Sequence, residues 1–283
     1  MEKISLLPNL QKDPKLEFTK KIAAEILKYK KCVFLPDTLS KTHIADKITY
    51  LPEAKLFEDS DLIIALGGDG TILKAAKTAA EYETLVMGIN IGHLGFLTQA
   101  EQDDPSFFAD IFSGNYKISK SMLLEIDIVR DEKVISSHLA FNDAVICGTY
   151  SKMIGLNISV DDTLMNEFVA DGVIFSTAAG STAYSMSAGG PIIHPKLECT
   201  LITPICPHSL NARSVVIPPE SVIAAKVIPP YRCDACVTVD GKMVHTLLKN
   251  DYVTVKKSDK YTMLLNLPQK NFFNTLRQKL NLR

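Results

Sequence analysis

One short segment, Gly67-Gly68-Asp69-Gly70-Thr71, combines the residue types that phosphate chemistry uses. Glycines let a backbone approach a ligand closely, and N–H groups at the start of a helix bind phosphate. Asp69 would repel a bare phosphate, so its carboxylate fits better as a metal ligand or as the general base for an attacking hydroxyl. The alternative is a tight turn in which Asp69 caps the helix. Taken alone, the segment favours phosphate chemistry.

Three further segments place polar residues where apolar runs end or break. Residues 90–97 (NIGHLGFL) follow a buried strand, at the edge where open α/β sheets bind ligands, although a plain loop is the alternative. Asn142-Asp143 interrupts an apolar run and could hold a ribose diol or the amino edge of adenine, or mark a bulge or turn. Residues 171–191 lead from a strand into a turn rich in Gly, Ser and Thr, with Tyr184 able to stack on a base. A packed core turn does not explain so many hydroxyls.

The first part of the chain alternates helical and strand patterns. The apolar spacing predicts a helix over 15–29, strands over 32–35, 61–66 and 84–90, and a helix from Thr71 to about Glu81. A strand, glycine turn, helix and strand in this order form a βαβ unit, which predicts a parallel sheet. We expect an α/β domain over residues 1–116, which carries the glycine turn.

The second part changes to strand patterns. Alternating apolar residues predict strands over 124–129, 155–160, 173–176, 222–228, 237–239 and 252–255. Asp240-Gly241 separates two apolar runs and predicts a hairpin turn. We expect a mostly-β domain over residues 117–267. Beyond Pro268, one face of a predicted tail helix needs an apolar surface, from the first domain or a partner subunit; its residues are Phe272, Phe273, Leu276 and Leu280.

Composition limits the classes of function. Of 283 residues, 46% are apolar and 22% charged, and the net charge is −1 without a basic stripe, so no nucleic-acid partner is expected. Residues 1–10 do not form a signal peptide, and no apolar run is long enough to span a membrane, so we expect a cytoplasmic protein. The six cysteines form no dense disulfide framework, and Cys233-Asp234-Ala235-Cys236 is interpreted as two ordinary thiols rather than a zinc or redox site.

The segments together resemble the NAD kinase family, in particular the bacterial kinases that use ATP or polyphosphate. The turn at 67–71 alone also occurs in lipid kinases and in one group of phosphofructokinases. Residues 171–195 are far more specific, with Gly180-Ser181-Thr182-Ala183-Tyr184 followed by Ser187-Ala188-Gly189-Gly190-Pro191. Residues 90–97, 142–143 and 205–210 match the family in the same order, and the likeness covers residues 62–267.

The resemblance implies an α/β first domain, a β-sandwich-like second domain and a C-terminal tail helix, residues 268–283, that packs back on the first domain. It implies transfer of the γ-phosphoryl of ATP to the 2′-hydroxyl of the adenosine ribose of NAD, which gives NADP. It also implies Mg²⁺ or a similar divalent ion, with no side chain assigned as its ligand. A homodimer or homotetramer is expected because the family builds its site across subunits.

The family's functional positions transfer residue by residue. Asp69 corresponds to the proton acceptor for the ribose 2′-hydroxyl. Gly68, Gly70 and Thr71 approach the phosphates, and Lys74 adds a positive charge there. Leu94 and Phe96 line the nucleoside pocket, and Asn142 and Asp143 bind adenosine. The dinucleotide is held by Asp171, Thr182, Ala183, Tyr184 and Ser187.

The chain departs from the family at three places. Ala178-Ala179 replaces Pro-Thr and removes a hydroxyl, Asp143 replaces a common Glu, and Val169-Ala170 stands where many members carry a basic residue before Asp171. The change before Asp171 affects part of the phosphate or nicotinamide contact, and none of the three departures involves Asp69. Two other functions remain open: a lipid kinase, which would need an acyl-chain surface, and a dinucleotide sensor without catalysis. The preferred phosphoryl donor, the choice between NAD and NADH, and feedback by NADPH do not follow from the sequence.

Overall fold

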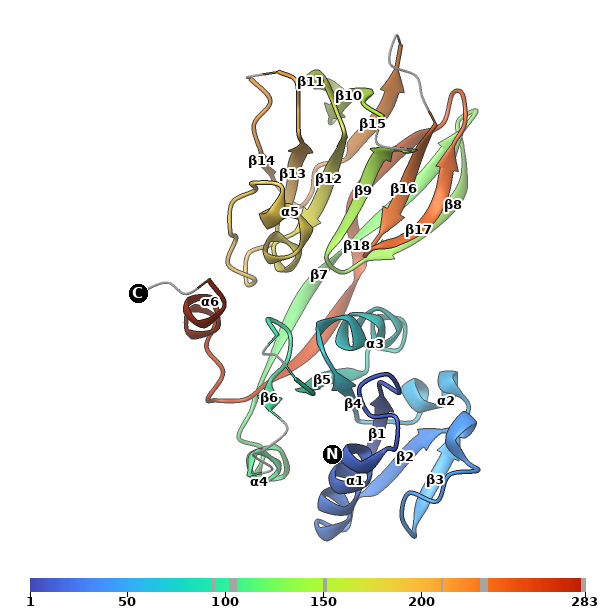
Figure 1. Ribbon diagram of the computed structural model, residues 1–283, viewed down its shortest axis with the longest axis vertical. Helices are drawn as coiled ribbons and strands as arrows, with labels where there is room; N and C mark the ends of the chain where they lie inside the picture. The colour runs from blue at the N-terminus through green and yellow to red at the C-terminus, as the bar shows by residue number, and fades with distance from the viewer. Residues whose placement is uncertain (93–94, 102–105, 150–151, 210, 230–233, 281–283) are drawn as a thin grey trace. The chain divides into compact units, whose positions relative to one another are not determined.

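The computed structural model describes residues 1–92, 95–101, 106–149, 152–209, 211–229 and 234–280. The chain divides into two compact units (Figure 1). Unit 1 comprises Met1–Lys120 and Tyr261–Arg283, and unit 2 comprises Ser121–Lys260. The long strands β7 (Lys117–Arg130) and β18 (Tyr252–Asn266) each contribute residues to both units.

Unit 1 is an α/β structure, as the sequence predicted. Its strands are β1 (Lys3–Pro8), β2 (Cys32–Pro36), β3 (Ile48–Leu51), β4 (Leu62–Gly67), β5 (Leu85–Asn90) and β6 (Ala100–Glu101). Its helices are α1 (Glu17–Lys28), the 3₁₀ turn η1 (Asp37–Leu39), α2 (Glu53–Glu58), α3 (Asp69–Tyr82), α4 (Phe107–Ser113) and α6 (Phe272–Leu280). The five principal strands are parallel in the order β5-β4-β1-β2-β3.

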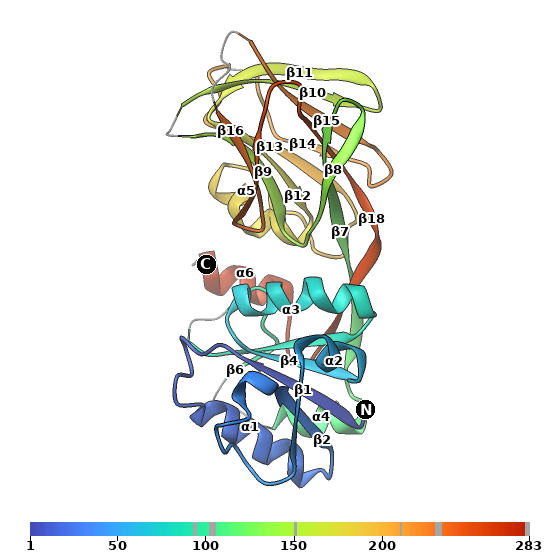
Figure 2. The same ribbon diagram turned by 90° about the vertical axis from the view of Figure 1, so that its right-hand side faces the viewer.

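Helices cover both faces of this sheet, which explains why its central strands are mostly apolar. All six residues of β4 and all six of β5 are buried. Figure 2 shows α2 and α3 on one face and α1 and α4 on the other. A core cluster lies under α1 and α4 and includes Ile22, Phe108, Ile64 and Met87. The carboxyl ends of β1, β4 and β5 lie together at one sheet edge, the place where such sheets bind ligands.

Unit 2 is built almost entirely of antiparallel strands, as expected. Beside β7 and β18 it contains β8 (Lys133–Ala140), β9 (Asp143–Gly148), β10 (Ile154–Val160), β11 (Thr163–Ala170), β12 (Gly172–Thr177), β13 (Thr200–Ile205), β14 (Val215–Ile217), β15 (Ile223–Ile228), β16 (Ala235–Val239) and β17 (Lys242–Leu247). One sheet has the order β14-β13-β12-β9-β16-β17. In the other, β11-β10-β15-β18 are neighbours, and β7 pairs with β18 and β8.

Two short helical turns interrupt unit 2 after β12. They are η3 (Ala179–Thr182) and α5 (Tyr184–Ser187), and Figure 1 shows α5 beside the ends of β12 and β13. The predicted hairpin turn is confirmed, because β16 and β17 pair up to Val239 and Lys242, and Asp240 and Gly241 between them have φ values of 49° and 75°. Such positive values are typical of a two-residue hairpin.

Several element boundaries differ from the predictions. Helix α3 begins at Asp69, two residues before the predicted start at Thr71, and β7 and β18 extend well beyond the predicted 124–129 and 252–255. The central strand β1 was not predicted at all. The tail helix α6 is present, but of its residues only Thr275 is buried, and Phe273 is 60% exposed.

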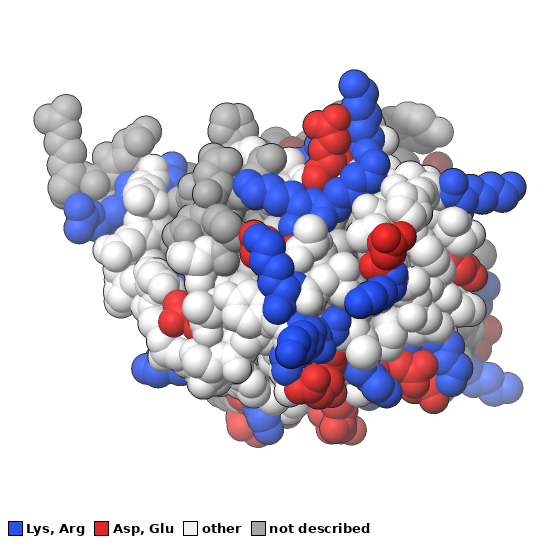
Figure 3. Space-filling model, turned by 90° about the horizontal axis from the view of Figure 1, so that it is seen from below, with Lys and Arg blue, Asp and Glu red and all other residues white. Residues whose placement is uncertain are grey.

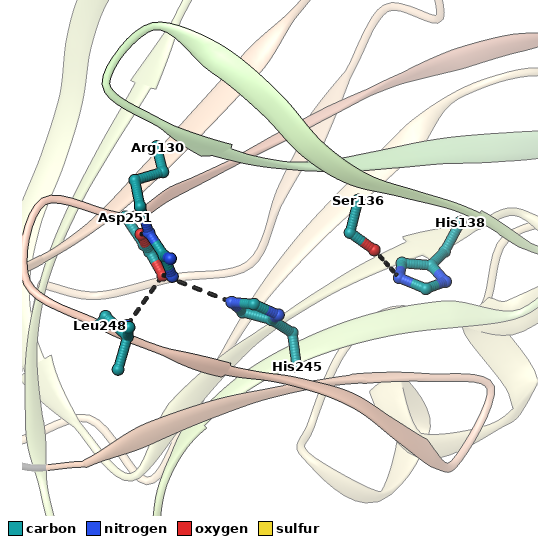
Figure 4. Close-up of polar contacts among 6 residues, drawn as sticks. All are labelled: Arg130, Ser136, His138, His245, Leu248 and Asp251. Atoms are coloured by element: carbon teal, nitrogen blue, oxygen red, sulfur yellow. Dashed lines mark hydrogen bonds and ion pairs between the residues drawn. The ribbon is translucent and has the colours of Figure 1, made fainter.

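Charged side chains form one buried network in unit 2. Asp251, whose side chain is fully buried, receives two hydrogen bonds from the Arg130 guanidinium, at 2.6 and 2.9 Å (Figure 4). His245 and the backbone N–H of Leu248 also contact Asp251, at 3.4 and 2.8 Å. These hydrogen bonds lower the pKa of Asp251 to about 2. The network fixes the loop between β17 and β18.

Surface charge is mixed. On the face shown in Figure 3, Lys and Arg side chains are interspersed with Asp and Glu. None of the helices in the described part of the chain is long and apolar enough to cross a membrane.

Candidate active site

The carboxylate of Asp69 is held by backbone groups from a distant loop. Asp69 is the first residue of α3, and Gly68 before it is extended and is the N-cap. One Asp69 oxygen accepts the N–H of Phe96 at 2.9 Å, and the other accepts the N–H of Leu97 at 3.0 Å. The side chain therefore does not cap its own helix, which excludes the simple capping interpretation. A fixed, ionisable oxygen lies at the start of a helix beside a glycine turn.

The loop that holds Asp69 is itself attached to the C-terminal tail. Lys270 donates a hydrogen bond from Nζ to the carbonyl oxygen of Gly95 at 3.2 Å. The Lys279 ammonium lies 5.1 Å from the centre of the Phe96 ring, within the range of a cation–π contact. The tail thus supports the loop next to the carboxylate. Leu94, predicted to line the nucleoside pocket, lies outside the described residues.

The glycine turn is packed against the segment that follows β1. Asn9 donates from Nδ2 to Thr71 Oγ1 at 2.9 Å, and a Cβ on Gly67 would lie 2.8 Å from the Thr71 Cβ. A Cβ on Gly70 would meet no heavy atom within 4 Å, so the space above this residue is open. The structure therefore leaves room at Gly70, whereas the Thr71 hydroxyl already has a protein partner.

Two lysines lie near this turn in different surroundings. Lys12 donates from Nζ to the Ile91 carbonyl oxygen at 2.9 Å, and a Cβ on Gly68 would lie 2.8 Å from the same nitrogen. Lys74, the residue chosen from the sequence, has a side chain that is 78% exposed and lies 3.3 Å from Glu53 on α2. Lys12 is therefore the ammonium next to the glycines. Sequence reasoning missed it because it follows β1, which was not recognised as a strand.

In unit 2, Asn142 directly precedes β9 and Asp143 begins it, and Asn142 contacts the turn after β12. Thr177 donates its N–H to the Asn142 carbonyl oxygen at 2.9 Å and its hydroxyl to the Phe141 carbonyl oxygen at 2.7 Å. Gly180 packs directly on Asn142, where a Cβ would lie 2.7 Å from the Asn142 Cα. The structure thus brings together two segments that the sequence analysis had selected separately.

Asp143 is a buried carboxyl with an unusual acidity. It is 5% exposed, and burial, assisted by the nearby charge of Asp240, raises its pKa to about 7. A hydrogen bond from the backbone N–H of Tyr184 acts in the opposite direction. At neutral pH this group exists in both protonation states, so it can donate as well as accept a hydrogen bond.

Some hydroxyl groups of the segment 171–191 form hydrogen bonds within the protein, whereas other residues of the segment are exposed. Ser181 donates to the Ala178 carbonyl oxygen at 2.7 Å and accepts the N–H of Ile193 at 2.9 Å, which closes the segment on itself. Ser185 contacts the Thr203 hydroxyl at 2.9 Å. The residues predicted to hold the dinucleotide are less enclosed. Thr182 and Ala183 are partly buried, and the exposed positions are Asp171, Tyr184 and Ser187.

One departure from the family pattern, Ala178-Ala179, has a local structural explanation. Ala178 is 3% exposed, so the methyl group packs in the interior. The hydroxyl that orders this turn comes from Thr177, whose Oγ1 accepts the N–H of Gly180 at 2.9 Å. The turn therefore keeps its shape without the hydroxyl that Ala179 lacks.

The protein groups near Asp69 do not form a metal cage. Within the described ranges, no three His, Cys, Asp or Glu side chains gather as a metal site. Asp69 offers a carboxylate, and each of its oxygens already accepts one backbone N–H. This donor set fits Mg²⁺ that is held mainly by nucleotide phosphates and water, the usual arrangement for this ion.

Models of known protein families match residues in both units. The family model of the ATP-NAD kinase N-terminal domain matches residues 15–114, and that of the C-terminal domain matches residues 142–267. The NAD kinases of Thermoanaerobacter pseudethanolicus and Caldanaerobacter subterraneus subsp. tengcongensis are each 39% identical, over 99% of this chain and 99% of theirs.

Two solved structures share the fold. Yeast NADH kinase complexed with NADH superposes with a TM-score of 0.87 and 25% identity, covering 100% of this chain and 88% of that one. An NAD kinase from Archaeoglobus fulgidus in complex with ATP gives a TM-score of 0.74 over 99% of this chain and 98% of that one, at 23% identity. The family models and these relatives define the class of protein, a phosphotransferase. The chain belongs to the NAD kinase family.

Proposed function

We propose that this chain phosphorylates NAD, moving the γ-phosphoryl group of ATP to the 2′-hydroxyl of the adenosine ribose and releasing NADP and ADP. The observation that carries the proposal is the Asp69 carboxylate, held by two backbone N–H groups beside an open glycine turn. Phosphoryl transfer requires mainly positioning and neutralisation of charge, with one group to accept the hydroxyl proton.

Asp69 would accept the proton of the ribose 2′-hydroxyl as its oxygen attacks the γ-phosphorus. The N–H groups of Phe96 and Leu97 keep the carboxylate in one orientation, so little reorganisation is needed when the proton moves. The start of α3 at Gly68 and Gly70 offers backbone N–H groups and the positive end of a helix dipole to the phosphates. The Lys12 ammonium adds a positive charge next to Gly68.

Mg²⁺ bound to the triphosphate would neutralise charge on the phosphates, with Asp69 as the available protein carboxylate. The nucleoside would be held in unit 2 by Asn142 and Asp143, and the rest of the dinucleotide by the exposed groups of Asp171, Tyr184 and Ser187. Tyr184 is 48% exposed, which leaves its ring free to stack on a base.

Location and assembly are part of the proposal. The cysteines that the structure describes are free thiols, which suits a reducing cytoplasm. We propose a homodimer or homotetramer, and light scattering coupled to gel filtration measures this mass directly.

The decisive experiment incubates the purified protein with NAD, ATP and Mg²⁺ and detects NADP with an NADP-specific dehydrogenase. Asp69→Asn should lower turnover by roughly 100-fold or more, the usual contribution of a general base. Asp46→Asn is the matched control, because that side chain is 93% exposed. Thermal unfolding establishes that both variants are folded.

The outcomes separate the competing functions. If the Asp69→Asn variant forms NADP as fast as the wild type does, the role of Asp69 as proton acceptor is refuted. Binding of NAD without turnover, with ATP, other triphosphates or polyphosphate, would favour the dinucleotide sensor. Turnover of a lipid acceptor in place of NAD would favour the lipid kinase.

A further inference from the structure

Asp240 makes contacts that a hairpin turn does not require. It is the first residue of the two-residue turn between β16 and β17. Its Oδ1 accepts the N–H groups of Asn142 at 2.8 Å and of Asp143 at 3.2 Å, and its Oδ2 accepts that of Phe141 at 3.1 Å. Its own N–H donates to the Asp143 carbonyl oxygen at 2.9 Å. One carboxylate thus gathers three consecutive backbone donors.

These three donors belong to the segment that begins β9. Asn142 follows directly after Phe141, which is fully buried, and precedes Asp143, which is 5% exposed. A carboxylate that accepts several N–H groups is fixed more strongly than a neutral acceptor would be. The backbone between Phe141 and Asp143 is therefore ordered by a residue 97 to 99 positions away in the sequence.

We propose that Asp240 is a positioning residue for the nucleoside site of unit 2, which orients Asn142 and Asp143 through their backbone N–H groups. The inference rests on the proposed function only in that Asn142 and Asp143 bind the adenosine of NAD. Nothing in it requires that the chain transfer a phosphoryl group.

The charge of Asp240 also affects the pKa of Asp143. The groups that act electrostatically on Asp143 are the Asp240 carboxylate and the backbone N–H of Tyr184, and the Tyr184 phenol is coupled to it in turn. Removal of the Asp240 charge should lower the pKa of Asp143, because a like charge nearby disfavours ionisation. A turn carboxylate that lies away from Asp143 would leave this pKa unchanged.

The test is NAD binding by isothermal titration calorimetry between pH 5.5 and 8.5, with no phosphoryl donor present. In the wild type, the dissociation constant should show an inflection near pH 7, where Asp143 titrates. In Asp240→Asn, affinity should fall roughly tenfold, and the inflection should move to lower pH. Asn is well tolerated at positive φ, so the turn itself is preserved.

Asp161 provides a matched control. It is also the first residue of a two-residue turn, between β10 and β11, with a φ of 48°. Its Oδ1 accepts the N–H of Val222 at 2.9 Å, and its N–H donates to the Val222 carbonyl oxygen at 2.9 Å. Asp161→Asn removes an equivalent turn carboxylate away from the Asn142-Asp143 segment. It should leave both the NAD affinity and the inflection unchanged.

Asp240→Gly is the second variant for the case in which Asp240→Asn does not fold, because it also removes the carboxylate and suits the positive φ of 49°. Asp143→Asn identifies the titrating group, and it should abolish the inflection. Unchanged NAD affinity in a folded Asp240 variant would overturn the proposal. Normal inflections in a protein that forms no NADP would refute the kinase activity while leaving the role of Asp240 intact.

Discussion

Replacement of Gly95 by alanine tests whether the loop after β5 fixes the proposed general base. A Cβ on Gly95 would lie 2.6 Å from Asp69 Cγ and 2.9 Å from Asp69 Oδ2, closer than such atoms pack. Either the loop or the carboxylate must move. The hydrogen bonds from Phe96 and Leu97, at 2.9 and 3.0 Å, would lengthen in either case.

The magnitude follows from those two bonds. A hydrogen bond to a charged group contributes about 1.5–3 kcal/mol. Weakening of the pair by the equivalent of one such bond corresponds to a loss of roughly 10- to 100-fold in kcat/KM, since each factor of ten in rate is about 1.4 kcal/mol. The expected loss is mainly in kcat, because the change affects the proton acceptor and leaves the nucleoside-binding residues of unit 2 untouched.

The assay is steady-state formation of NADP, with thermal unfolding measured on the same samples. Gly114→Ala is the control, since Gly114 ends α4 with a φ of +83° and has no heavy atom within 4 Å of an added Cβ. It should cost about 1–2 kcal/mol of stability through backbone strain and leave kcat unchanged. A kcat/KM for Gly95→Ala within twofold of the wild type would refute the idea that this contact positions Asp69.

Two other perturbations test the remaining charged groups. Lys12→Met should raise the KM for ATP several-fold because it removes the ammonium next to Gly68, whereas Lys74→Met should have little effect. A larger rise in the KM for ATP in Lys74→Met than in Lys12→Met would favour Lys74, the residue chosen from the sequence. Arg130→Met should lower the free energy of unfolding at pH 7 by about 2–3 kcal/mol, measured by urea denaturation, because it leaves the buried Asp251 without its main partner. The folded-state pKa of Asp251, about 2, lies below the unfolded value, so this stability is present above pH 4 and is lost as the pH falls towards 2. Equal wild-type and variant stability at pH 7 would contradict this account.

The sequence predicted the α/β unit well because its strands are buried on both faces. β4 and β5 are short, buried and almost wholly apolar runs separated by a glycine turn and a helix, which is a strong pattern. β1 was missed although it is equally central, pairing with both β2 and β4. Its apolar run is short and lies at the start of the chain, and only tertiary pairing distinguishes it from a disordered end.

Charged residues concealed the full length of the strands that connect the units. The predicted strand 252–255 stopped before Lys256 and Lys257, which break the alternation of β18. In the structure, Lys256 lies 2.9 Å from Glu125 and 3.6 Å from Asp127, both on β7. Opposite charges on paired strands stabilise a sheet as apolar pairs do. This pairing is invisible to a test for apolar periodicity.

The candidate site was predictable in its residue types and unpredictable in its contacts. Asp69 is held by N–H groups 27 and 28 positions later in the chain, and Asp240 holds N–H groups 97 to 99 positions earlier. In both places the supporting segment approaches through a glycine, Gly95 against Asp69 and Gly180 against Asn142. Both glycines lie in segments that the sequence analysis selected as candidate ligand sites, yet in the structure each is required for contact between protein segments. Glycines near a site therefore indicate how its polar residues are held as well as where a ligand can lie.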